Sequence, residues 1–460
     1  MKVWLSGLVI VIASSIGASA QDTRQVSEPR IPASYVVLSA QLHATNNTLA
    51  EADETKLDTE RIQKALDACA AGKAVELKAD GDKNAFVSGP LELRSNVTLL
   101  LDKGVTLYAS RNPKDYDTAP GGCGTSGAES RPCKPLIGVH DVHNASVMGE
   151  GVIDGRGDKG VIGKPYTWWQ QSRAAEPTNT KYSAPRLIVA NHADGLVLYK
   201  IRLHNSPNFH VTVNNTNGFT AWGVHLLTPT VRGTDARNTD GIDPGSSENI
   251  TVRESWIDNG DDNIAIKTGT HKMSVIDNRF YSGHGMSMGS ETNTSDSDIL
   301  VDGLTLDHTT SGIRIKSNVQ RGGPVRNVTY RHLCMRDVEV PISISPFYNG
   351  QTTDGIEDLG MKGDRIPDYK EVHLEDVHSL TPGLIQVAGL NQEHLTEISF
   401  DGVQVDGIKP AQARFRFTKA TVGAGGINFP ILGEGVSAPS ASSKTTKVSS
   451  CQGKFLPYQD

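Results

Sequence analysis

The chain has 460 residues, of which 37% are hydrophobic, which is enough for one large folded domain or two of ordinary size. Lysine and arginine total 45 against 52 aspartates and glutamates, so the formal net charge is -7. An acidic chain of this kind is not expected to bind nucleic acid or a membrane surface. Any positive site for an anionic ligand must therefore be local.

The first twenty residues have the composition of a secretory signal. Lys2 is followed by an apolar run that ends in the small residues Ala18, Ser19 and Ala20. We expect cleavage after Ala20, secretion to the extracellular space and no membrane attachment of the mature chain; an uncleaved N-terminal anchor is the alternative. Residues 21–460 are expected to form a single domain and a monomer, with a loose Ser/Lys-rich tail at about 434–450.

The cysteines fit an exported protein. Cys123 and Cys133 flank the Gly-rich loop "CGTSGAESRPC" and are expected to form a disulfide. The total of five cysteines is odd, so at least one thiol stays free, and the pairing of the others is open. No cysteine or histidine spacing is typical of a metal site, so we expect neither a metal nor a cofactor.

One short helix is predicted near the N-terminus, and strands follow it. In "LDTERIQKALDACA" the apolar residues recur at helical spacing: Ile62, Ala65, Leu66 and Cys69. Asp58 is placed to cap this helix. From about Val75 onward the chain consists of short Val/Ile/Leu-rich runs broken by Asn, Gly and Asp, which predicts many short strands and tight turns.

The strands recur at a regular interval. The apolar-x-apolar units are Leu187–Val189, Val211–Val213, Ile242, Ile264–Ile266, Met286–Met288, Ile313–Ile315 and Ile342–Ile344. From Ile242 onward their first residues are 22, 22, 27 and 29 positions apart. A repeat of this length without an intervening helix predicts an all-β fold, a parallel β-solenoid whose first coil is covered by the N-terminal helix.

Three titratable residues occupy one position of this repeat. Asp240, Asp262 and His284 each stand two residues before the first apolar residue of a strand, and Asp261 precedes Asp262. Equivalent positions of successive coils stack at about 4.8 Å, so these side chains are expected to lie together. The residues just before them suggest turns: Asn238, Gly260 and Gly283. A turn would allow both adjacent aspartates to face outward.

Cations are predicted beside this acidic cluster. Arg314 and Lys316 alternate with Ile313 and Ile315, which puts both on the outer face of their strand. Lys267 has the same register as Lys316; a role in substrate binding and that of a solvated strand-end lysine are equally compatible with this position. Paired cations beside an acidic cluster favour an anionic substrate.

Clustered carboxylates in a groove are typical of glycoside hydrolysis. One acid protonates the leaving oxygen while an ionised one activates water or attacks the sugar. Mutual repulsion raises the pKa of at least one carboxyl group. The residues alone therefore predict a secreted hydrolase of an acidic sugar polymer.

Four motifs resemble those of polygalacturonases, family 28 of the glycoside hydrolases: "NTDGID", "GDDNIAIK", "SGHGMS" and "RIKS". Further segments resemble the bacterial endopolygalacturonases, among them "RIQKALDAC", "GVIDGRG" and "NSPNFHV". The resemblance implies a right-handed parallel β-helix. It also implies inverting hydrolysis of the α-1,4 bonds of polygalacturonate, the homogalacturonan of pectin, which would be the binding partner of the chain.

The resemblance also implies roles for single residues. Asp261 matches the general acid, Asp240 and Asp262 match the pair that activates water, and His284 would tune the charge of this trio or share a proton with the acid. The implied substrate-binding residues are Asn238, Arg314, Lys316 and Tyr348.

Several alternatives stay open. The enzyme could be an exopolygalacturonase instead of an endo-acting one, or a rhamnogalacturonan hydrolase, although His284 and the basic motif favour homogalacturonan. A calcium-dependent pectate lyase and a non-catalytic β-helix are further alternatives. For His210 a structural role is favoured, and for Trp168 and Trp169 packing is favoured over a sugar platform.

Overall fold

The computed structural model describes residues 21–178, 180–228, 236–350, 355–439 and 446–459. The predicted signal segment 1–20 lies outside the described residues. Within the described ranges, no helix is both long enough and apolar enough to cross a membrane.

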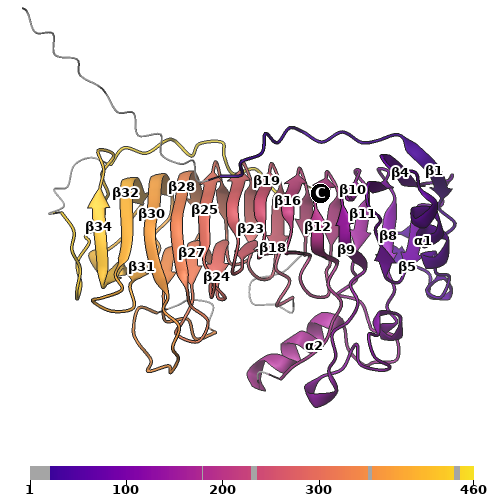
Figure 1. The fold of residues 1–460 in the computed structure, drawn as a ribbon, viewed down its shortest axis with the longest axis horizontal. Coiled ribbons are helices and arrows are strands. Elements are labelled where there is room, and N and C mark those ends of the chain that lie inside the picture. The colour runs from indigo at the N-terminus through magenta and orange to yellow at the C-terminus, as the bar shows by residue number, and fades with distance from the viewer. Residues whose placement is uncertain (1–20, 179, 229–235, 351–354, 440–445, 460) are drawn as a thin grey trace, which may run out of the picture.

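The described strands wind into a parallel β-helix with three stacks of strands along its axis (Figure 1). The first stack contains β1 (Ser34–Ser39), β4 (Lys73–Lys78), β7 (Val97–Leu101), β10 (Ser146–Met148), β13 (Val197–Tyr199), β16 (Asn217–Trp222), β19 (Glu248–Arg253), β22 (His271–Ile276), β25 (Asp296–Asp302), β28 (Pro324–Arg336), β30 (Asp368–Ser379), β32 (Thr396–Val405) and β34 (Thr418–Val422). The second contains β5 (Ala85–Ser88), β8 (Thr106–Ala109), β11 (Val152–Asp154), β14 (Arg202–His204), β17 (His225–Leu227), β20 (Trp256–Asn259), β23 (Arg279–Ser282) and β26 (Thr305–Asp307). The long strand β28 pairs with both β25 and β26 and so joins the two stacks.

The third stack carries the candidate site. It contains β6 (Leu91–Glu92), β9 (Ile137–His143), β12 (Ile188–Asp194), β15 (Val211–Asn214), β18 (Ile242–Gly245), β21 (Ile264–Ile266), β24 (Met286–Gly289), β27 (Ser311–Lys316), β29 (Val340–Ser345), β31 (Ile385–Ala388) and β33 (Ala413–Arg416). The remaining elements are a hairpin, β2 (Ala44–Thr45) and β3 (Thr48–Leu49), and the short helices η1 (Glu51–Asp53), η2 (Pro113–Tyr116), η3 (Gly127–Glu129), η4 (Glu176–Thr178) and η5 (Pro410–Gln412). The prediction of an all-β parallel β-helix is thus confirmed.

The register of the third stack follows the predicted repeat. Ile242 pairs with Ile264, Ile264 with Met286, Met286 with Ile313, and Ile313 with Ile342. All five side chains are fully buried inside the coil. Burial of each such side chain stabilises the fold by about 1.5–3 kcal/mol, which fixes the inward residues and so the direction of the alternate, outward ones.

The predicted phase of one strand was wrong. The unit Leu187–Val189 was expected to pair through its first residue, but Ile188 pairs with Val211. Ile188 and Ala190 are buried within β12, whereas Val189 is partly exposed. A slip of one residue exchanges the two faces of a strand. The repeat position, which lies two residues before the first paired residue Ile188, is therefore occupied by Arg186.

The helix predicted at the N-terminus is present. Helix α1 (Thr59–Ala68) lies at the N-terminal end of the β-helix (Figure 1) and buries Ile62 and Leu66. The expected capping hydrogen bond from the Asp58 side chain is absent. That carboxylate instead forms an ion pair with Arg61 at 2.6 Å and accepts a hydrogen bond from the Val87 N–H at 3.0 Å, so it joins the helix to the first coils.

A second helix, α2 (Trp168–Ala175), was not predicted. It projects from the β-helix beside the third stack (Figure 1) and begins with a capping box formed by Thr167 and Gln170. Trp168 and Trp169 are 1% and 7% exposed, and the Trp169 indole donates a hydrogen bond to the Ser206 carbonyl at 2.9 Å. Both tryptophans therefore pack against the fold and form no sugar platform.

Both ends of the described chain run back along the outside of the β-helix (Figure 1). Near the N-terminus, the Asp22 N–H donates to the Ser274 hydroxyl at 2.9 Å. Near the C-terminus, Tyr281 donates a hydrogen bond to the Leu456 carbonyl at 2.8 Å. A disulfide between Cys334 and Cys451 fixes the second segment to β28.

The cysteine predictions are confirmed as far as they went. Cys123 and Cys133 form the expected disulfide, and Cys69 is the free thiol among the described cysteines.

The tail expected to be loose at 434–450 is attached to the coils at both of its described ends. The Ser437 N–H donates to the Thr418 carbonyl, and the Lys447 N–H donates to the Gly425 carbonyl, each at 2.8 Å. Residues 440–445 between them lie outside the described residues.

Candidate active site

A cleft of about 620 Å³ lies over the outer face of the third stack. It is lined by strands β15, β18 and β27 of this stack and by the turns before and after the strands. Arg173 of α2 and Tyr348 also line it. The sequence-predicted residues Asn238, Asp240, Asp261, Asp262, Lys267, His284, Arg314, Lys316 and Tyr348 all line this one cleft.

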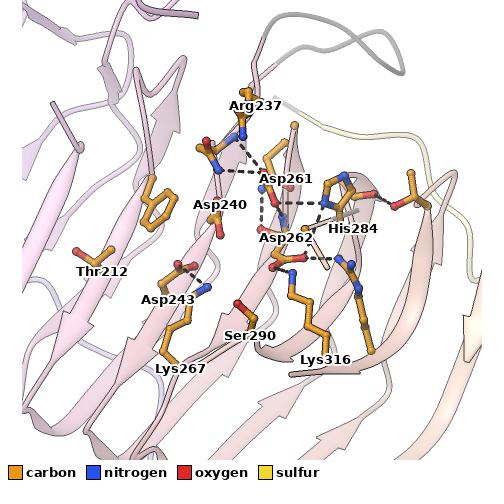
Figure 2. Close-up of a pocket in the computed structure, with 18 of the residues that line it drawn as sticks. Thr212, Arg237, Asp240, Asp243, Asp261, Asp262, Lys267, His284, Ser290 and Lys316 are labelled. Atoms are coloured by element: carbon orange, nitrogen blue, oxygen red, sulfur yellow. Dashed lines mark hydrogen bonds and ion pairs between the residues drawn. The ribbon is translucent and has the colours of Figure 1, made fainter. Parts of the chain in front are cut away.

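The turn between β20 and β21 presents the two adjacent aspartates. Asn263 donates hydrogen bonds to the Asn259 side chain at 2.7 Å and to the Ile257 carbonyl at 3.2 Å, which closes the turn from inside. Gly260 is required because a Cβ atom there would lie 2.2 Å from the Ala236 carbonyl oxygen. The turn interrupts the strand alternation, so Asp261 and Asp262 both face the cleft (Figure 2).

Asp262 is a buried carboxylate with a full set of donors. It is 1% exposed, and its Oδ2 accepts a hydrogen bond from the Lys316 ammonium at 2.7 Å. Its Oδ1 accepts one from the Ser287 hydroxyl at 2.7 Å and lies 3.5 Å from the Arg314 guanidinium. Burial raises the pKa of Asp262, but Lys316 and Arg314 outweigh it and hold the pKa below its usual range. Asp262 is therefore ionised.

Asp261 forms a pair with His284. The imidazole Nδ1 lies 3.2 Å from Asp261 Oδ1, and the Asn238 N–H donates to Asp261 Oδ2 at 3.0 Å (Figure 2). Burial would raise the pKa of Asp261, but the charge of the His284 imidazolium and of the Lys316 ammonium lowers it. Without substrate, the Asp261 carboxyl group is therefore ionised.

Asn238 is held so that it can support Asp261. Its backbone adopts a left-handed conformation with φ of 55°, which directs its N–H toward the aspartate. Its side-chain oxygen accepts a hydrogen bond from the Tyr182 hydroxyl at 3.1 Å, and Asn208 donates to the same hydroxyl at 3.1 Å. Tyr182 and Asn208 were not recognised in the sequence. Tyr182 lies outside the repeat, whereas Asn208 directly precedes Phe209 as Asp261 precedes Asp262, so the spacing could have indicated it.

Asp240 is buried, and few groups around it would stabilise a negative charge. It is 3% exposed, and its Oδ1 has no hydrogen-bond partner among the described residues. Burial, together with the Asp243 and Asp261 carboxylates, raises the pKa of Asp240 well above its usual range. The cluster thus combines carboxyl groups with opposite pKa shifts, as the predicted acid and base chemistry requires.

A fourth aspartate of the cleft, Asp243, was missed in the sequence. It is 3% exposed, and neither of its oxygens has a hydrogen-bond partner among the described residues. The Lys267 ammonium is 3.8 Å from Oδ2 (Figure 2). Burial raises the pKa of Asp243 to about 7, although Lys267 opposes the rise. The signal was available, because Asp243 follows Ile242 and so must point outward.

Lys267 lies against this carboxylate and is not a freely solvated lysine. Its side chain is 25% exposed, and its ammonium also donates to the Gly289 carbonyl at 3.3 Å. Burial would lower the pKa of Lys267, but the Asp243 and Asp240 carboxylates raise it. The cation is therefore charged at the floor of the cleft.

Arg314 and Lys316 lie on the outer face of β27 as predicted, but both are covered. They are 1% and 5% exposed, because the cleft encloses them and Asp262 binds both. The Arg314 guanidinium carbon and the Lys316 ammonium lie 5.8 Å and 5.4 Å from the centre of the Tyr348 ring. The three side chains form a compact wall beside the carboxylates.

His210 has the structural role that its sequence context favoured. It is fully buried, its Nε2 lies 2.8 Å from the Thr228 hydroxyl, and its Nδ1 lies 3.1 Å from the Asp240 carbonyl oxygen. Burial lowers the pKa of His210 to about 4. A neutral imidazole at this point holds the backbone of Asp240 in place.

The cluster could in principle ligate a cation. Ligand atoms of Asp261, Asp262 and His284 lie within 4.8 Å of one another. However, Lys316 and Arg314 already neutralise Asp262. Since protein cations supply the charge that a divalent ion would bring, the donor set is poorly suited to a metal.

The comparison with known families agrees with this geometry. Residues 69–423 match the family described as glycosyl hydrolases family 28. The chain belongs to this family. The predicted family resemblance and the prediction of a glycoside hydrolase are therefore confirmed.

Individual relatives of this family 28 chain match it over most of their length. An endo-polygalacturonase of Pectobacterium carotovorum subsp. carotovorum is 39% identical over 404 residues, which are 87% of this chain and 93% of the relative. A polygalacturonase of Ralstonia solanacearum is 35% identical and covers 87% of this chain and 84% of its own. The solved polygalacturonase from Erwinia carotovora ssp. carotovora is 36% identical, covers 93% of this chain and 100% of its own, and has a TM-score of 0.71.

Proposed function

We propose that the protein is a secreted, monomeric endopolygalacturonase that hydrolyses the α-1,4 bonds of polygalacturonate with inversion. The observation that carries the proposal is the stack formed by Asp240, Asp262 and His284 on consecutive coils, with Asp261 beside it, in a family 28 chain. Relatives named endo-polygalacturonase and polygalacturonase support the substrate and the endo mode.

Asp261 is the general acid in this mechanism. His284, whose Nδ1 lies 3.2 Å from the Asp261 carboxylate, is the neighbouring group that can share a proton with it. A polyanionic substrate adds negative charge to the cleft, which raises the pKa of Asp261 and favours its protonation. Asp261 then protonates the glycosidic oxygen as the bond to the leaving sugar breaks.

Asp240 and Asp262 activate the attacking water. Asp262 stays ionised because Lys316 and Arg314 hold it, while the unpartnered Oδ1 of Asp240 can accept a hydrogen bond from water. The water attacks the anomeric carbon from the face opposite to the leaving group, which inverts the configuration, and its proton passes to the two aspartates.

The cations and the aromatic wall bind the sugar chain. Arg314 and Lys316 supply the positive charge that holds a galacturonate carboxylate, and Tyr348 packs against a pyranose ring. Lys267 contributes a further positive charge on the floor of the cleft. Asn238 keeps the acid in place through its N–H.

The test is hydrolysis of polygalacturonate followed by three readouts. We expect an early collapse of viscosity relative to the release of reducing ends, no ultraviolet absorbance from an unsaturated product, and the β-anomer as first product by NMR. Slow viscosity loss with release of short products would show an exo enzyme, and an absorbing product would show a lyase. The Asp261→Asn variant should bind the polymer without cleaving it.

A further inference from the structure

The column that contains the catalytic residues continues toward the N-terminus. Ile188 of β12 pairs with Val211 of β15, which pairs with Ile242 of β18. The residues two positions before these are Arg186, Phe209 and Asp240, so Arg186 and Phe209 occupy the same repeat position as Asp240 on the two preceding coils. Both line the cleft.

Arg186 is held in place without a carboxylate partner. Its guanidinium carbon lies 4.6 Å from the centre of the Phe209 ring, which is a cation–π contact. No acidic side chain of the described residues lies within ion-pair distance of it. Burial is the main cause of the raised pKa of Asp243, and the positive charge of Arg186 is one of those that oppose the rise. A half-buried guanidinium in a cleft, without a hydrogen-bond or ion-pair partner among the described residues, is suited to bind a planar anion.

The position of Arg186 in the stack defines which sugar unit of the substrate it would contact. Two coil spacings, roughly 10 Å, separate the Arg186 position from that of Asp240. Arg314, Lys316 and Tyr348 lie on the opposite side of the acidic cluster. A carboxylate at Arg186 therefore belongs to a unit beyond the one whose bond is cleaved, at the other end of the cleft from Tyr348.

We propose that Arg186, stacked on Phe209, binds the free carboxylate of a galacturonate unit on the side of the catalytic cluster opposite to Tyr348. This inference rests on the proposed function and adds a specificity element to it. A methyl-esterified sugar has no negative charge and cannot form the bidentate ion pair with the guanidinium, so the enzyme selects a de-esterified unit at this position.

The experiment compares the wild type with Arg186→Gln and with Arg94→Gln, a matched change of an exposed arginine that pairs with Asp67 in the N-terminal coils. Affinity for the galacturonate hexamer is measured by calorimetry in an Asp261→Asn background, and KM and kcat are measured in the active background. A charge-assisted contact predicts about a ten- to hundredfold loss of affinity, a similar rise in KM and little change in kcat for Arg186→Gln. Arg94→Gln should change neither.

Chain length and esterification separate specificity from structure. The shortest oligomer that the wild type cleaves should show a smaller effect of Arg186→Gln than the hexamer. Replacing polygalacturonate by its randomly half-esterified form should lower the affinity of the wild type by a larger factor than that of the variant. Equal affinity of variant and wild type for the hexamer would overturn the proposal, as would an equal loss on all substrates accompanied by a lower melting temperature. If the wild type fails to cleave polygalacturonate, the proposed function itself fails, and this is seen before any variant is compared.

Discussion

Replacing Asp243 by asparagine should make the protein more stable at alkaline pH. Asp243 is 3% exposed, its oxygens have no hydrogen-bond partner among the described residues, and its pKa is raised from 3.8 to about 7 by burial. Asparagine has nearly the same shape and carries no charge at any pH. The substitution therefore removes the cost of keeping a carboxylate in this position.

The size and sign of the effect follow from the pKa shift. A rise from 3.8 to about 7 is equivalent to about 4 kcal/mol. Between about pH 4 and pH 7 the folded chain holds a proton at Asp243 that the unfolded chain releases, so stability is lost as the pH rises through this window. Asp243→Asn should equal the wild type near pH 4 and exceed it by up to about 4 kcal/mol at pH 8.

The assay is the melting temperature of both proteins between pH 4 and pH 8. With an unfolding entropy of about 2.1 cal/mol/K per residue, about 4 kcal/mol corresponds to roughly 4 °C for a chain of this length. Asp82→Asn, a change at an exposed aspartate, serves as the control and should show no pH-dependent gain. A variant that is less stable than the wild type at pH 8, or that gains equally at both pH values, would refute the reasoning.

Three further outcomes test the site. Asp261→Asn should regain activity on an oligogalacturonide with a nitrophenyl leaving group, whereas Asp240→Asn should not, because a good leaving group needs no acid but still needs an activated water; rescue of both would reject the assignment. Lys316→Met should lower the free energy of unfolding by about 3–5 kcal/mol, measured with urea, because the buried Asp262 carboxylate loses its nearest cation; an unchanged value would contradict the ion pair. Addition of EDTA should leave the initial rate on polygalacturonate unchanged, since protein cations balance the carboxylates, and a loss restored by a divalent ion would disprove this.

The part of the site closest to the regular repeat was predictable from sequence. Ile242, Ile264 and Met286 are spaced by 22 residues, and an inward residue on each coil fixes the outward positions on either side of it. The stack of Asp240, Asp262 and His284 follows from this spacing alone. Asp243 follows from the same alternation, so its omission was an error of reasoning and not a lack of signal.

Other features depend on information that a repeat does not carry. Arg186 was missed because its strand was placed one residue out of phase: Leu187 and Ile188 are both apolar and both buried, and only the pairing with Val211 decides between them. The disulfide of Cys334 with Cys451 joins residues 117 positions apart, and the tail that carries it crosses the coils without pairing as a strand. Neither contact has a local sequence signature.

The parallel β-helix explains why the carboxylates can be held so close. Like charges a few ångströms apart repel one another, and a flexible loop would separate them. Here Asp240 and Asp262 project from turns one coil apart, and the turns are fixed by the fully buried residues that follow, Ile242 and Ile264. The carboxylates therefore cannot move apart, and their pKa values diverge: burial and the neighbouring carboxylates raise that of Asp240, whereas Lys316 and Arg314 lower that of Asp262. The cation at Lys316 holds Asp262 ionised, so the choice of roles among chemically identical side chains is made by a strand two coils beyond Asp262.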